Sequence, residues 1–66
     1  MNATYCVVKQ SGFKGYLWHG NLFNVPRKGD RIVLNNKAYM VLDVGWYLDT
    51  NEEMAHITVQ FNSYCL

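Results

Sequence analysis

The sequence predicts an all-β fold, a small five-stranded antiparallel barrel. Its 66 residues leave room for one domain, expected to span residues 1–66. Half of the residues are hydrophobic and only 17% are charged, which is too apolar for a disordered chain. Runs of β-branched and aromatic residues alternate with turn residues, as in a meander of strands.

Two segments in the first third of the chain are expected to be extended. Thr4 to Lys9 is rich in β-branched and aromatic side chains, and Gln10-Ser11-Gly12 ends it. Phe13 to Asn24 is interrupted by glycines at positions 15 and 20. For this second segment we expect an irregular strand, or an arm with a bend near His19-Gly20-Asn21.

A hairpin and a final strand are expected in the remainder. Asn35-Asn36 separates Arg31–Leu34 from Lys37–Leu48, and asparagine tolerates the positive φ that a tight turn requires. Asp49 to Glu53 is expected to be a loop, and Ala55 to Tyr64 the last strand. In that strand the apolar positions 57, 59 and 61 alternate with polar ones.

The long strand contains a change of phase. Tyr39 and Val41 share one face, whereas Val44, Trp46 and Leu48 lie at an odd offset from them. An extra residue near Leu42-Asp43, a β-bulge, would restore the alternation and bend the strand, so that it serves both halves of a small barrel. The alternative is a straight strand with its even-numbered apolar side chains pointing inward, namely Met40, Leu42, Val44, Trp46 and Leu48.

The clearest turn signal runs from Val25 to Ile32. Pro26 ends strand pairing, Gly29 can adopt a left-handed conformation, and Asp30 can accept hydrogen bonds from backbone N–H groups. The spacing Pro26-x-x-Gly29-Asp30-x-Ile32, followed by Tyr39-x-Val41-x-x-Val44-x-Trp46, resembles the turn–strand–strand unit of SH3-like small barrels. It also resembles short barrel proteins that bacteriophages and mobile elements encode.

This resemblance covers about residues 25–48 and 55–61. It implies an SH3-like barrel and a binding function, because barrels of this kind bind nucleic acids, peptides, nucleotides or one another. It assigns no functional residue.

The charge is balanced overall but unevenly distributed. A net charge of +1 argues against a dedicated binder of duplex DNA. Residues 1–37 hold all six basic residues and one acidic residue, which gives +5, and residues 38–66 hold four acidic residues, which gives −4. Either these charges pair across the sheet, or the folded domain has a basic face.

Aromatic and cationic residues interleave in two stretches and predict a site for an anionic, nucleotide-like ligand. A base stacks on aromatic rings while cations neutralise its phosphates. The candidate ligand-binding residues are Lys14, Tyr16, Trp18, His19, Arg27 and Lys28. The alternative is that Trp18, Tyr16 and Phe23 are core or oligomer contacts and that the cations are solvated.

Neither a metal site nor a cofactor site is expected. The four candidate zinc ligands, Cys6, His19, His56 and Cys65, have none of the short spacings typical of structural sites. The chain has no nucleophile elbow, Walker loop or HExxH motif, so we expect no catalytic residue and no enzyme. A Cys–His pair that is close only in space stays open.

Three functions are compatible with these features. The first is a non-enzymatic accessory or anti-defence protein of the phage type, which sequesters a small anionic nucleotide-like ligand. The second is a protein-interaction module, an inhibitor or structural adaptor that binds a host protein, and the third, disfavoured by the charge, is a binder of single-stranded nucleic acid. Because the core is small and the chain has ten aromatic residues, we expect a homo-oligomer.

The sequence also predicts where the protein resides. The residues from Met1 to Val8 include no basic residue before the apolar stretch, and the longest apolar run is the five residues from Ala38 to Leu42. We therefore expect no secretion signal, no membrane contact and a cytoplasmic location, in the host cytosol for a phage-encoded chain. There both cysteines would remain thiols.

Overall fold

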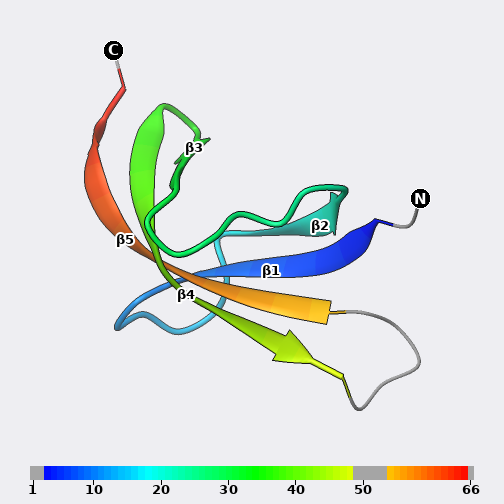
Figure 1. Cartoon of the computed structure of the whole chain (residues 1–66). Helices are drawn as coiled ribbons and strands as arrows, with labels where there is room; N and C mark the ends of the chain where they lie inside the picture. The colour runs from blue at the N-terminus through cyan, green and yellow to red at the C-terminus, as the bar shows by residue number, and fades with distance from the viewer. Residues whose placement is uncertain (1–2, 49–53, 66) are drawn as a thin grey trace.

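The computed structural model describes residues 3–48 and 54–65, and the elements that they form are all strands (Figure 1). These are β1 (Thr4–Gln10), β2 (Trp18–Leu22), β3 (Arg31–Leu34), β4 (Lys37–Tyr47) and β5 (Met54–Tyr64). The predicted all-β class is confirmed. The loop expected at 49–53 lies outside the described residues.

The strands form one sheet in the order β2-β1-β5-β4-β3. Three neighbouring pairs are antiparallel, but β1 and β5 run parallel, with Val8 opposite Ile57. The expected strictly antiparallel arrangement is therefore wrong at this pair. Alternation along a strand determines which side chains share a face but carries no information on strand direction, and the connection from β1 to β5 is long enough for a parallel crossover.

The sheet curls on itself into a half-barrel (Figure 1). The first and last strands in this order, β2 and β3, form the two edges of the described sheet and are not paired with each other. The curvature expected of a barrel is present, but one side is open. The finer SH3-like assignment stays a prediction.

The predicted β-bulge in β4 is confirmed. Val41 lies opposite Val59 and Asp43 opposite Thr58, so Leu42 is an extra residue on β4. The bulge returns Val44 to the face of Val41, and the exposed Met40 shows that the straight-strand alternative is wrong. A second shift, between Ala38 and Tyr39, was not predicted.

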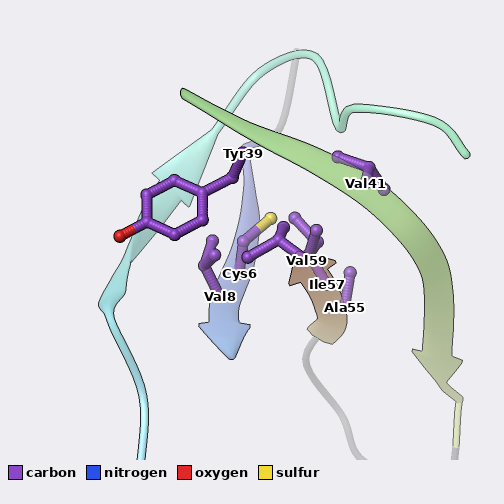
Figure 2. Close-up of a cluster of buried hydrophobic side chains, with 7 residues drawn as sticks. All are labelled: Cys6, Val8, Tyr39, Val41, Ala55, Ile57 and Val59. Carbon is purple, nitrogen blue, oxygen red and sulfur yellow. The ribbon is translucent and has the colours of Figure 1, made fainter. Parts of the chain in front are cut away.

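The core lies on the inner face of the curled sheet. Side chains from β1, β4 and β5 point toward one another there (Figure 2). The cluster consists of Cys6, Val8, Tyr39, Val41, Ala55, Ile57 and Val59. Its members on β1 and β5 occupy alternate positions, as expected for strands with one buried face.

The second strand is more regular than expected. β2 runs straight through His19-Gly20-Asn21 in register with β1, with Gly20 opposite Cys6, so the predicted bend there is wrong. The irregular part precedes the strand, where Gly12 and Gly15 both have φ of +82°. Gly20 instead leaves room for the Trp18 ring.

Both predicted turns are confirmed. Asn35 and Asn36 have φ of 50° and 64°, the positive values that a two-residue hairpin turn requires. Gly29 has φ of 94°, and the Asp30 carboxylate accepts the Arg27 N–H at 2.8 Å. The Gly29 N–H donates to the Val41 carbonyl at 2.9 Å, which holds this turn against β4.

We expect Gly29→Ala to lower the free energy of unfolding by about 1–2 kcal/mol, because an L side chain is strained at this positive φ. Urea denaturation followed by circular dichroism measures the change. Lys28→Ala is the matched control, since Lys28 is an exposed residue of the same turn. Equal stability of the two variants would contradict the assigned turn geometry.

Candidate functional site

The inner face carries an apolar pocket between the two edge strands, β2 and β3, which are not paired with each other. Its volume is about 150 Å³, and both β2 and β3 contribute to its walls. The lining residues are Val8, Trp18, Leu22, Pro26, Ile32, Leu34 and Ile57. A dry cavity of roughly 150 Å³ accepts a benzene molecule in another protein. This pocket therefore has the size and chemistry for one leucine- or phenylalanine-sized group.

Trp18 forms one wall of the pocket because Gly20 leaves room for its ring. A Cβ at position 20 would lie 2.8 Å from both Cη2 and Cζ2 of Trp18, closer than atoms approach in folded proteins. Trp18 packs partly buried against the core. Its placement agrees with the alternative reading, in which this ring is a structural contact.

Aromatic and histidine side chains gather on the outer face. A hydrogen bond joins the Tyr5 hydroxyl to His19 Nδ1 at 2.9 Å, and the Tyr16 ring meets the His19 ring edge-on at 5.0 Å between centroids. Farther along the sheet, the centroids of the Tyr47 and His56 rings lie 4.3 Å apart. Val7 pairs with both His19 and His56, so it separates the two groups.

Sequence reasoning missed Tyr5, Tyr47 and His56 as members of this surface. The alternation within β1 places Tyr5 opposite to the buried Cys6, and that signal was readable. The approach of His56 to β2 depends on the parallel pairing of β1 with β5, which no local pattern specifies.

The six predicted ligand-binding residues do not lie together: they are divided between the two faces of the sheet and the connections on either side of β2. Tyr16 and His19 are in contact at the outer face, whereas Trp18 belongs to the inner face. Arg27 and Lys28 follow Pro26, a residue of the pocket wall, and Lys14 lies in the connection between β1 and β2. The structure thus brings Tyr16 and His19 together and separates Trp18 from them.

The cations of the described residues have no carboxylate partners among those residues. Arg31 donates to Cys65 Sγ at 3.4 Å, and Lys37 lies over the Tyr64 ring, 6.0 Å from its centroid. Charge pairing across the sheet is therefore not observed in the described ranges. Three of the four acidic residues in the second half, at positions 49, 52 and 53, fall outside them.

The cysteines and histidines do not assemble into a reactive pair within the described ranges. Cys6 is buried in the inner face, where its Sγ donates to the Thr4 carbonyl at 3.4 Å, while both histidines belong to the outer face. Burial raises the pKa of the Cys6 thiol, because it disfavours the charged thiolate. Residues 3–48 and 54–65 contain no group of three or more potential ligands that could hold a metal ion.

Large apolar side chains are unusually exposed at the end of β4. Trp46 and Tyr47 are about half exposed, and Leu48 is 77% exposed. Other rings, among them Phe13, Tyr16 and Phe23, are exposed as well. Exposed apolar patches on small proteins mark interaction surfaces.

No described helix is long and apolar enough to cross a bilayer. No protein-family model, curated protein or solved structure matches the chain.

Proposed function

We propose that this chain is a non-enzymatic binding module, which takes an apolar side chain of another polypeptide into the pocket of its inner face. The observation that carries this proposal is the pocket itself, because it is apolar throughout and lies between two edge strands that do not pair with each other. Burying one leucine or phenylalanine side chain contributes about 1.5–3 kcal/mol. The free backbone groups of an edge strand add hydrogen bonds to an extended ligand.

The chemistry of the pocket favours a polypeptide over a nucleotide. A nucleobase has hydrogen-bonding groups along its edges, and an apolar lining would leave them desolvated without partners. A nucleotide-like ligand stays a prediction for the exposed Tyr16–His19 pair, where a base could stack. The phage-type anti-defence role likewise stays a prediction, as does binding of single-stranded nucleic acid.

Capped amino acids test the pocket directly. We expect N-acetyl-phenylalaninamide and N-acetyl-leucinamide to shift the NMR signals of Val8, Leu22, Ile32 and Leu34, whereas N-acetyl-asparaginamide leaves them unchanged. Leu34→Arg, which places a long charged side chain at the pocket, should abolish these shifts. Val33→Arg is the matched control, because Val33 is 54% exposed and alternates with Leu34 on β3.

ATP is the competing probe in the same titration. Shifts confined to Tyr16 and His19 with ATP, together with no response of the pocket to either apolar probe, would overturn the polypeptide-binding proposal and favour the nucleotide.

A further inference from the structure

The segment at the end of β4 has the chemistry that the pocket requires. Leu48 follows β4 directly and is 77% exposed, and Trp46 and Tyr47 before it are also exposed. In the sequence, Leu48 is followed by Asp49, Glu52 and Glu53, which are three of the five acidic residues of the chain. Leu48 is thus a free apolar side chain next to the most acidic stretch of the protein.

The turn that follows Pro26 of the pocket wall has the opposite charge. Arg27 and Lys28 follow Pro26 of the pocket wall, and both are exposed without an ion pair to another described residue. The one carboxylate in this turn, that of Asp30, is turned back onto the Arg27 N–H. Residues 27–31 therefore carry a net charge of +2.

We propose that the polypeptide bound by the pocket is a second copy of this chain, with Leu48 of one copy inserted in the pocket of the next. This inference rests on the proposed function. The apolar insertion excludes water, and attraction between the acidic stretch and Arg27 and Lys28 selects the orientation. It also accounts for the charge asymmetry between the two halves of the sequence.

The contact joins two different surfaces. In the single copy Leu48 is exposed, so it does not occupy its own pocket. When two copies join through such unlike surfaces, one Leu48 segment and one pocket stay free at the two ends of the pair. Further copies can therefore add in the same way, until the assembly closes into a ring or continues as a filament.

Complementation between two variants tests this contact. Leu48→Asp removes the inserted side chain and Leu34→Arg blocks the pocket, so each variant alone should sediment as a 7.7 kDa monomer where the wild type is larger. An equimolar mixture of the two should form a one-to-one heterodimer in native mass spectrometry, because it retains one intact contact. Val33→Arg should assemble like the wild type.

A charge reversal tests the same contact without altering the pocket. Arg27→Glu with Lys28→Glu should weaken self-association by more than about tenfold, with a smaller loss at high salt. Combining these two reversals with Glu52→Lys and Glu53→Lys in the same chain should restore self-association, because the charges of both surfaces are then exchanged. This test stands even where Leu34→Arg fails to fold.

Two results would overturn the inference. One is assembly of both single variants at wild-type strength, and the other is a charge-reversed variant that associates like the wild type. A wild type that stays monomeric, while the capped amino acids still shift the pocket signals, would overturn the second copy as the partner and leave the proposed function standing. If the pocket signals also fail to shift with the capped amino acids, both the second copy as partner and the proposed function are wrong.

Discussion

Ile57→Ala is expected to lower the free energy of unfolding by about 2–5 kcal/mol, the usual range for truncating a buried isoleucine. Ile57 has no exposed surface, belongs to the core cluster, and forms part of the pocket wall. It also pairs with β1 on one side and β4 on the other. Because small domains lie at the low end of the range of folding stability, this loss is expected to leave much of the protein unfolded.

Urea denaturation followed by circular dichroism measures the effect. Val33→Ala is the control, since it shortens a β-branched side chain of the same sheet that is 54% exposed. If Ile57→Ala lowers the free energy of unfolding no more than Val33→Ala does, Ile57 is not part of the core.

Gly20→Ala is expected to lower the free energy of unfolding by about 1–3 kcal/mol, the usual cost of overpacking. The added methyl group would lie 2.8 Å from the Trp18 ring, so the ring must leave its position above Gly20. Because Trp18 forms a wall of the pocket, the same substitution should also change the response of the pocket to N-acetyl-phenylalaninamide.

Gly45→Ala provides a matched comparison, because it adds the same methyl group to another strand of the same sheet. There the nearest atom would be the His56 carbonyl oxygen at 4.0 Å, an ordinary contact. Its stability should equal or slightly exceed that of the wild type, since alanine loses less backbone entropy than glycine on folding. Trp18 fluorescence in a Trp46→Phe background reports the ring movement. An unchanged spectrum for Gly20→Ala would show that the ring does not depend on Gly20.

Local patterns in the sequence predicted much of the fold. The alternation around Ile57 identified the buried face of β5, and Asn35-Asn36 identified the hairpin. The odd offset between Val41 and Val44 located the bulge at Leu42, because a strand with one buried face must keep its side-chain phase. Each of these signals lies within a few residues of the feature that it predicts.

The features that the sequence did not predict depend on pairings between strands that are far apart in the chain. The parallel partnership of β1 with β5 leaves no local mark, and neither does the opening between β2 and β3. The pocket consists of residues spread from Val8 to Ile57, so no short motif describes it. Trp18 and His19 are neighbours in sequence and were predicted to form one site, yet consecutive residues of a strand point to opposite faces.

The bulge at Leu42 gives this position of β4 a role that depends on spacing more than on side-chain chemistry. Leu42 has no partner on β5, while the residues on either side of it do. A deletion here would turn the bulge into regular pairing, with Asp43 still opposite Thr58 and Val44 still opposite Ile57, but β4 would lose the local bend that helps to curl the sheet. Substitutions at position 42 would leave the spacing intact. Diversity among natural variants should therefore include different side chains at this position, while the number of residues between Val41 and Val44 stays constant.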